Sequence, residues 1–284
     1  MRTAVLGVGL IGGSIGLAAR QRLDAEVVGW GPRRATLERA LELGAIDRAA
    51  GSVEEACAGA ELVFCAGPVA ALSELAGAAL AASGPQTVVS DAGSTKRGIV
   101  AALGEDERFV GGHPLAGAET AGVENARADL FEGASWYLTP TERTGGALYD
   151  RLERAITGLG ARPRAIDAAA HDRVMATVSH LPHVLADLLA AQAAAELTHD
   201  AERLPEVGPS FRDATRVAGS NPAIWGDIFA ANSDAVVAAI DDAVARLREA
   251  RELIAAGDPQ AIAAWHARAA QSRAELDQGP DRGE

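Results

Sequence analysis

A glycine-rich turn near the N-terminus, at residues 7–12, constrains the fold of this chain most strongly. It follows the aliphatic run 3–6 and precedes a second apolar run at 14–19. Between a strand and a helix, the first glycine of such a turn permits the bend, the second lets backbone approach a pyrophosphate, and the third lets helix pack on strand. The segment therefore predicts a dinucleotide-binding unit, with the phosphates at the helix N-terminus. The predicted cofactor-binding residues here are Gly7, Gly9, Leu10, Ile11 and Gly12.

A secretory signal is the competing interpretation of the same segment. Arg2 precedes an apolar run that ends in the small residues Ala18 and Ala19. Five glycines between residues 7 and 16 argue against it, because glycine weakens an apolar helix but suits a phosphate-binding turn. A second predicted strand at 26–30 completes a βαβ crossover and favours the nucleotide-binding interpretation.

Two patterns divide the chain into two predicted domains. Up to about residue 165, short aliphatic strands alternate with helical segments, which is typical of a mostly parallel, doubly wound α/β sheet of the Rossmann type. Beyond about Ala168 the segments are alanine-rich and helical, with breaks near 205–209 and 221–222. We expect a dinucleotide-binding domain at 1–167 and an all-α domain for substrate binding and dimerisation at 168–284. The later predicted strands are 61–65, 87–90, 108–111 and 135–138.

Composition narrows the class of protein. The net charge is −13 and the pI is about 4.9, which disfavours nucleic acid as a partner because nucleic acid requires a basic surface. The sequence has no uninterrupted run of 18 apolar residues, so no membrane span is expected. The two cysteines, Cys57 and Cys65, exclude a disulfide framework and indicate a reducing cytoplasm, with both thiols acting as buried small hydrophobes.

The segment from Asp91 to Lys96 follows a predicted strand and opens a helix. It therefore lies at the carboxyl edge of the sheet, where open α/β folds bind ligands. Lys96 is the only lysine in the chain, and we expect Asp91 and Lys96 to lie at the cofactor site. Ser94 can cap the helix and face the active site. The alternative is an ordinary N-cap followed by a solvated lysine.

The segment from Gly112 to Glu119 places a titratable imidazole in a glycine-rich turn downstream of the dinucleotide unit. The unperturbed pKa of imidazole lies close to neutral pH, so His113 can take a proton while a nicotinamide takes a hydride. The alternative is a histidine that only satisfies a turn, but the flanking glycines and Pro114 build a rigid, exposed loop.

These motifs, with two from the helical half, resemble the prephenate/arogenate dehydrogenase family in order and spacing. The resemblance covers about residues 1–275. The family oxidises the ring carbinol of prephenate, or of its amino counterpart arogenate, and couples hydride transfer to loss of the ring carboxylate as CO₂ in tyrosine biosynthesis. The matching segments are 7–12, 91–96, 113–117, Ser179-His180-Leu181-Pro182-His183 and Phe211-Arg212-Asp213-Ala214-Thr215-Arg216.

The resemblance implies a role for each matching residue. His113 accepts the proton of the ring hydroxyl, and Ser94 orients the histidine and the hydroxyl. Arg216 binds the ring carboxylate, for which a planar guanidinium fork is well suited. The other expected substrate-site residues are Asp213 and Glu119, in an ionic network with Arg216, and Ser179 and His183, which share one helical face.

Other interpretations of the helical motifs, as a surface salt bridge or as a metal site, compete with these roles. Asp213 and Arg216 alone would indicate a surface salt bridge. A metal site built from His171, His180 and His183 lacks a carboxylate or cysteine set at ligand spacing, and Pro182 is expected to interrupt the helix start, so no metal is predicted. We expect His180 to point away from the face of Ser179 and His183.

The cofactor end of the second strand departs from the common NAD pattern. An NAD site usually has an acidic residue there, whereas this chain has Gly31 followed by Arg33 and Arg34. We predict NAD(P) as the cofactor. Two features favour NADP over NAD: no carboxylate is present to repel a 2′-phosphate, and two guanidiniums are present to bind it. The alternative is that both arginines only open the next surface helix while NAD binds.

Two other function classes remain for comparison. A β-hydroxyacid-type or imine-type dehydrogenase would usually have a catalytic lysine in the helical domain, and this chain has none after Lys96. A nucleotide-binding sensor would not need both His113 and Arg216. The apolar faces of helices such as 231–254 predict a homodimer. Preference for prephenate or arogenate, and inhibition by tyrosine, stay open.

Overall fold

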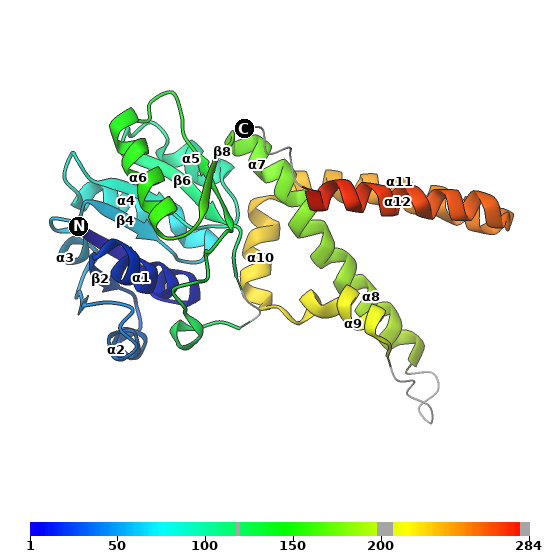
Figure 1. Cartoon of the computed structure of the whole chain (residues 1–284), viewed down its shortest axis with the longest axis horizontal. Coiled ribbons are helices and arrows are strands. Elements are labelled where there is room, and N and C mark those ends of the chain that lie inside the picture. The colour runs from blue at the N-terminus through cyan, green and yellow to red at the C-terminus, as the bar shows by residue number, and fades with distance from the viewer. Residues whose placement is uncertain (118–119, 198–206, 279–284) are drawn as a thin grey trace. The chain divides into compact units, whose positions relative to one another are not determined.

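The sheet that organises this chain is built from eight strands in the order β3-β2-β1-β4-β5-β6-β7-β8 (Figure 1). The computed structural model describes residues 1–117, 120–197 and 207–278. All neighbouring strands pair in parallel except β6 and β7, which are antiparallel. The strands are β1 (Arg2–Leu6), β2 (Glu26–Trp30), β3 (Arg48–Ala49), β4 (Leu62–Cys65), β5 (Val88–Asp91), β6 (Phe109–Pro114), β7 (Ser135–Thr139) and β8 (Arg162–Ala165).

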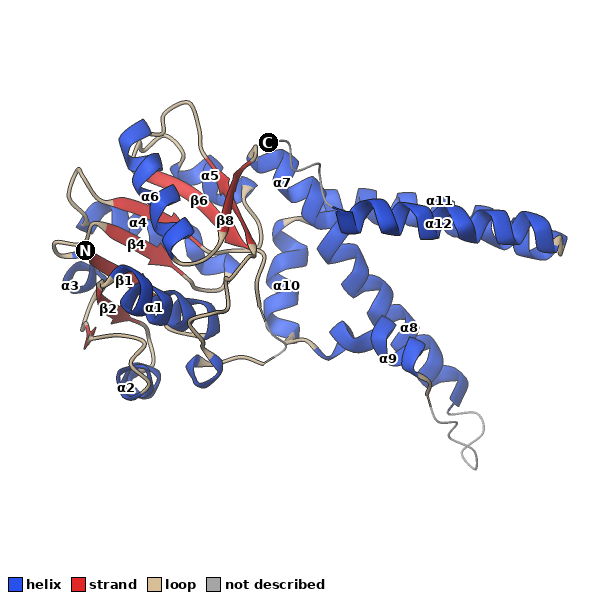
Figure 2. Cartoon of the chain, in the orientation of Figure 1, coloured by secondary structure: helices blue, strands red, loops and turns tan. Residues whose placement is uncertain are grey.

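Helices cover both faces of the sheet, as a doubly wound fold requires (Figures 1 and 2). One buried cluster packs α1, α2 and α6 against one face, and a second packs α3, α4 and α5 against the other. Cys57 and Cys65 are both buried in the second cluster, as expected of small apolar side chains. The helices are α1 (Leu10–Leu23), α2 (Arg34–Glu42), α3 (Val53–Cys57), α4 (Val69–Ala82), α5 (Arg97–Leu103) and α6 (Gly146–Gly158), with a 3₁₀ turn at Val123–Asn125.

The predicted Rossmann-type α/β fold and the helical second half are confirmed. All six predicted strands are present, to within a few residues at their ends. Two further strands, β3 and β8, were not predicted. Strand β3 has only two residues, and β8 is an edge strand of sequence Arg-Pro-Arg-Ala without apolar alternation, so neither has a periodic signal.

A continuous helical stretch begins the second half of the chain. It runs through α7 (Ala168–Met175), a π-helical turn (Ala176–His180) and α8 (Leu181–Leu197). The prediction that Pro182 interrupts this helix is wrong, because the wide π turn directly before it lets the helix continue past a residue that lacks an N–H. By length and composition the stretch could span a membrane, but Asp172 and His180 within it are buried against other polar groups of the protein.

Five more helical segments follow residue 206. They are α9 (Pro209–Thr215), a 3₁₀ turn (Arg216–Gly219), α10 (Pro222–Ala231), α11 (Ser233–Ala256) and α12 (Pro259–Gln278). Helix α9 packs along α8. Asn221 caps α10, which confirms the predicted break at 221–222. Of the predicted break at 205–209, residues 205 and 206 lie outside the described residues, and α9 begins at Pro209. The helix expected at 231–254 starts at Ser233, because the chain bends by 91° at Asn232.

The chain separates into two compact units, Met1–Val236 and Val237–Glu284. The first contains the sheet and the helices through α10. The second contains most of α11 and all of α12, joined at Gly257, which adopts a left-handed backbone conformation with φ of +71°. Every residue that the sequence predicts to be functional lies in the first unit.

Candidate active site

The glycine turn between β1 and α1 has the shape of a phosphate cradle. A Cβ on Gly12 would lie 2.0 Å from the carbonyl oxygen of Gly7, so only glycine fits there. Gly7 has a φ of +97°. A Cβ on Gly9, by contrast, would meet no atom within 4 Å, and Gly9 is the N-cap of α1 without a side-chain hydrogen bond. The space beside Gly9 at the N-terminus of α1 is thus open, which fits the approach of an anionic pyrophosphate.

The segment 91–96 forms a buried polar turn after β5. Lys96 and Asp91 are completely buried and form an ion pair, and Asp91 also accepts hydrogen bonds from the backbone N–H groups of Gly93 (2.8 Å) and Gly112 (3.0 Å). The alternative of a solvated lysine is therefore wrong. Burial lowers the pKa of Lys96, and the Asp91 carboxylate opposes this shift. Asp91 thus fixes the turn against the strand that contains His113.

Ser94 does not cap the helix that follows, contrary to expectation. Helix α5 starts at Arg97, two residues later than a Ser94 cap would place it, and its N-cap Lys96 makes no side-chain capping bond. The backbone N–H groups of Lys96 and Arg97 are instead accepted by the carboxylate of Asp172, at 2.7 and 2.9 Å. The cap comes from a residue about 75 positions further along the chain.

His113 is placed near the end of β6, opposite Tyr137 of β7. Its Nδ1 lies 2.8 Å from Nε2 of His171, and the two rings meet edge to face. Burial is the main cause that holds the pKa of His113 well below its usual value, and the positive potentials of His171, Lys96 and His180 add to it. His113 is therefore a neutral imidazole at neutral pH, able to accept a proton.

The sequence did not identify the two residues behind His113. His171 and Asp172 are buried, and Nδ1 of His171 lies 2.8 Å from Oδ1 of Asp172. Burial raises the pKa of Asp172, but hydrogen bonds from His171 and from the backbone of Arg97 and Lys96 outweigh it, so the net pKa is low. The only signal in the sequence is a His-Asp pair near a helix start, which does not reveal its distant partners.

A second buried residue, Asn232, joins this group to α10 and α11. Its Nδ2 donates to the backbone oxygen of Asp172 (2.8 Å) and contacts Nδ1 of His180 (3.2 Å), while its Oδ1 accepts from Arg97 (3.1 Å). Arg97 also pairs with Asp172 and Asp234, which raises its pKa. His180 thus points into this network and not toward the pocket, and burial lowers its pKa to about 4.

A pocket of about 480 Å³ brings four of the predicted site residues together. They are His113, Ser179, His183 and Arg216, from β6, the π turn, α8 and the 3₁₀ turn. Ser94 and Asp213 are not among the described residues that line it, and Asp213 is exposed on α9. Glu119 lies outside the described residues. The remaining lining residues are Pro114, Leu115, Ala116, Gly117, Met175, Val178, Val217, Ser220 and Trp225.

Trp225 is a pocket residue that the sequence motifs did not reveal. Its indole stacks on the ring of His183, with centroids 3.3 Å apart and planes 27° apart. Nδ1 of His183 lies 3.0 Å from the backbone oxygen of Ser179 and is fixed by it, so Nε2 is the free ring nitrogen. The pocket therefore offers an aromatic wall, the imidazoles of His113 and His183, and one guanidinium.

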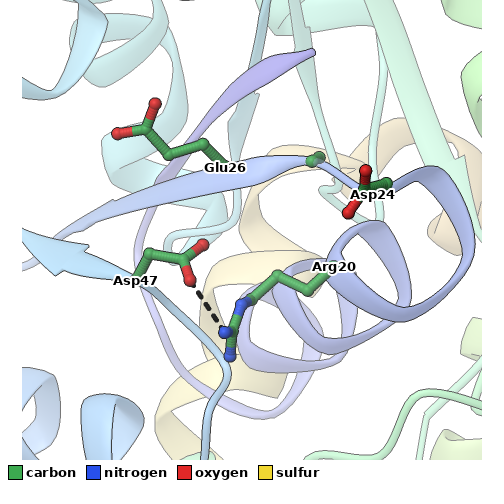
Figure 3. Close-up of a pocket in the computed structure, with 5 residues that line it drawn as sticks. Arg20, Asp24, Glu26 and Asp47 are labelled. Carbon is green, nitrogen blue, oxygen red and sulfur yellow. Dashed lines mark ion pairs between the residues drawn. The ribbon is translucent and has the colours of Figure 1, made fainter.

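A second hollow lies at the opposite, amino end of β2 (Figure 3). Its charged residues are Arg20, Asp24, Glu26 and Asp47. Asp47 pairs with Arg20 at 2.7 Å and accepts the backbone N–H of Val27 at 2.8 Å, so it fastens α1 to β2. Ligands of open α/β sheets bind at the carboxyl edge, and this hollow is at the other edge. Within the described parts of the chain, no group of three metal-ligating side chains is present.

Fold and site together define the class of protein. A glycine cradle for a dinucleotide lies at the carboxyl edge of a Rossmann sheet, and a neutral imidazole faces a pocket that also contains an arginine. This combination is that of a nicotinamide-dependent dehydrogenase, in which a base removes the hydroxyl proton of the substrate.

Comparison with known proteins identifies the family. Residues 15–164 match the nucleotide-binding domain of prephenate dehydrogenase, and residues 167–267 match its dimerization domain. The chain belongs to the prephenate dehydrogenase family. It is 34% identical over 268 residues to the prephenate dehydrogenase of Bacillus subtilis, covering 89% of this chain and 70% of that one.

Solved structures of two relatives share the whole fold. The prephenate dehydrogenase of Aquifex aeolicus, in complex with hydroxyphenyl propionate and NAD⁺, superimposes with a TM-score of 0.86 at 30% identity, covering 97% of this chain and 98% of that one. The arogenate dehydrogenase of Synechocystis gives a TM-score of 0.81 at 26% identity, covering 98% and 99%. The chain is therefore an oxidoreductase with a nicotinamide cofactor.

Proposed function

We propose that this chain catalyses the oxidative decarboxylation of prephenate to 4-hydroxyphenylpyruvate in tyrosine biosynthesis. The observation that supports this most is the presence of His113 and Arg216 in one pocket of a chain of this family. The relative that binds hydroxyphenyl propionate, a close analogue of the product, supports it further. A nicotinamide cofactor, when bound at the glycine turn, would supply the hydride acceptor.

The protein residues divide the remaining chemistry between them. His113 takes the hydroxyl proton at Nε2 as the ring C–H bond breaks toward the cofactor, and the bond to the ring carboxylate then breaks to release CO₂ and an aromatic ring. Arg216 holds a carboxylate of the substrate with its guanidinium fork. We assign Ser179 and His183 to the substrate side chain, Ser94 to orientation of the hydroxyl, and Asp213 and Glu119 to the ionic surroundings of Arg216.

The proposed cofactor residues are those of the glycine turn and of the two strand ends beside it. Gly7, Gly9, Leu10, Ile11 and Gly12 would hold the pyrophosphate, and Asp91 and Lys96 would support the neighbouring turn. We infer NADP in preference to NAD. A Cβ on Gly31 would meet nothing closer than 3.9 Å, which leaves space for a 2′-phosphate, and Arg33 and Arg34 are exposed beside it. Arg34 also forms an exposed ion pair with Glu38, which a 2′-phosphate would replace.

Arogenate is the second candidate substrate, because it differs from prephenate only at the side-chain carbon. The Synechocystis relative is an arogenate dehydrogenase with the same fold. The free Nε2 of His183 would face either a keto acid or an amino acid in this pocket. Because Nδ1 is hydrogen-bonded to a carbonyl oxygen, an accepting Nε2 would suit the ammonium of arogenate as well as a water next to prephenate.

Purified enzyme supplied with each substrate and each cofactor tests the proposal. Prephenate should give NAD(P)H, CO₂ and 4-hydroxyphenylpyruvate in equal amounts. Turnover of arogenate alone, with tyrosine as the product, would replace prephenate with the second candidate. Turnover of neither substrate with either cofactor would contradict the proposed function.

We further propose a domain boundary at residues 167–168, a homodimer and a cytoplasmic location. The two family models meet at this boundary, and the second is a dimerization domain. Helix α11 exposes Val237, Val244, Leu247 and Ile254 within about one third of its circumference, an apolar face suited to a second copy. Sedimentation equilibrium should give twice the chain mass of 29.1 kDa.

A further inference from the structure

We propose that His171 and Asp172 hold His113 in one tautomer, with its proton on Nδ1 and the lone pair of Nε2 directed to the pocket. His171 and Asp172 are thus positioning residues for the base. This inference rests on the proposed function of His113, but the tautomer itself can be measured without any substrate.

Asp172 determines the direction of the two hydrogen bonds that link it through His171 to His113. Its carboxylate accepts from the backbone N–H groups of Lys96 and Arg97, and the Arg97 guanidinium lies 3.3 Å from Oδ2. An ionised carboxylate can only accept, so Nδ1 of His171 must be the donor in their 2.8 Å contact.

The same reasoning determines which nitrogen of His113 carries the proton. A neutral imidazole has one donor and one acceptor, so the Nε2 of His171 is an acceptor when its Nδ1 donates. Nδ1 of His113, 2.8 Å away, must then carry a proton. The remaining nitrogen of His113, Nε2, is left without a proton, as a general base requires.

The surroundings make this arrangement rigid. His171 and Asp172 have exposures of 0% and 1%, so water does not compete for their hydrogen bonds. Asp172 is attached to the start of α5 through two N–H groups and to Asn232 through its backbone oxygen. Tyr137 packs edge-on against the His171 ring at 5.7 Å. Three parts of the fold, β6, α5 and α7, therefore meet at this pair.

The Asp172 carboxylate also has a role after His113 has taken the proton of the substrate. When His113 becomes an imidazolium, its Nδ1–H already points to His171, whose own N–H points to the negative charge of Asp172. The series of hydrogen bonds from His113 to Asp172 thus stabilises the charge that forms on the base, although burial and the positive charge of Lys96 oppose it.

Two substitutions of His171 separate this role from packing. Asparagine places an amide N–H near the position of Nδ1, so it can still donate to Asp172 but has no acceptor for His113. Glutamine reaches the position of Nε2 with its carboxamide oxygen and can accept from His113. His266→Asn, on an exposed face of α12, is the matched control.

Ring ¹⁵N NMR of the protein without ligands reports the tautomer, and a spectrum of His113→Asn assigns the His113 signals. We expect Nδ1–H in the wild type, in His171→Gln and in the control, and a mixture in His171→Asn. With prephenate, His171→Asn should lose about 10- to 100-fold in kcat with KM within threefold, and His171→Gln should lose less.

A proton on Nε2 of His113 in the wild type would overturn the proposal, even if neither variant folds. So would an unchanged tautomer, or kcat within threefold of wild type, in folded His171→Asn. If the tautomer behaves as expected but the wild-type enzyme does not oxidise prephenate or arogenate, the proposed function fails and the arrangement of His113 stands.

Discussion

The two sides of the active-site pocket differ in burial and in how their polar groups are held. On the side of β6, α5 and α7, residues His171, Asp172 and Lys96 are almost completely buried, and each forms at least one hydrogen bond or ion pair within the protein. On the other side, neither α9 nor the 3₁₀ turn that starts at Arg216 contains a buried residue. Under the proposed function, the proton acceptor is therefore supported by the buried side, and the substrate carboxylate would bind to the exposed side.

This difference has a physical basis. A proton acceptor works best when its orientation is fixed before the substrate arrives, because no reorganisation is then needed during the reaction. A carboxylate clamp gains its strength only when the ligand excludes water from it. Substitutions on the buried side should therefore change kcat, and those on the exposed side should change KM.

The largest effect is expected for His113→Asn. Asparagine has no basic nitrogen, so kcat should fall by about two or more orders of magnitude while KM stays within a few-fold. Steady-state kinetics with prephenate measures both, with His266→Asn as the control. A kcat within threefold of wild type would remove His113 from the mechanism and with it the distinction between the two sides.

Arg216→Ala should show the opposite pattern. Loss of the guanidinium should raise KM by the equivalent of about 2–4 kcal/mol, because the substrate carboxylate is left unpaired when it is desolvated. Arg216→Lys should rescue poorly, since ammonium lacks the planar fork. Arg212→Ala is the matched control, because Arg212 is exposed on α9 outside the described pocket lining. An unchanged KM would place the carboxylate elsewhere.

Acid should lower the stability of the folded protein through His180, which lies on the buried side of the pocket. Its pKa is lowered from 6.5 to about 4, mainly by burial and further by His171 and His183, while Asp172 opposes the shift. The unfolded chain therefore binds a proton that the folded chain refuses between pH 6.5 and 4, so stability falls as the pH falls through this window. His180 should account for about 2 kcal/mol of unfolding free energy between pH 7 and pH 5.

His180→Gln tests this, because glutamine can still accept from Asn232 but does not titrate. Urea unfolding at pH 7 and pH 5 should show a smaller pH-dependent loss in the variant than in the wild type. The same loss in both proteins would assign the acid sensitivity to other groups, of which His113 is the first candidate.

The smallest effect concerns the cofactor and lies on the exposed surface. Arg33 or Arg34 should favour NADP over NAD about tenfold at low salt, and higher ionic strength should reduce the preference because the contact is exposed. Gly31→Asp should reverse it, since the aspartate would fit the open space, bind the ribose hydroxyl and repel a 2′-phosphate. A wild-type kcat/KM that is higher for NAD would show that the arginines only begin α2.

Sequence reasoning succeeded where residue type alone determines the local structure. The glycine turn, the strand that ends at His113, and the Ser179–His183 spacing were all predictable from neighbouring residues. It failed where partners are distant: the cap of α5 comes from Asp172, and the ring that stacks on His183 comes from Trp225 on α10. Strand β8 has no apolar alternation because it lies at the edge of the sheet, so its residues gave no periodic signal.

Direct binding of prephenate to the two variants is the measurement that tests the division between the two sides most directly. Calorimetric titration of His113→Asn with cofactor present should give a Kd close to the wild-type KM, because only the chemical step is lost. Arg216→Ala should bind prephenate at least about 30-fold more weakly, the equivalent of about 2 kcal/mol. Loss of binding in His113→Asn, or undiminished binding in Arg216→Ala, would contradict the account.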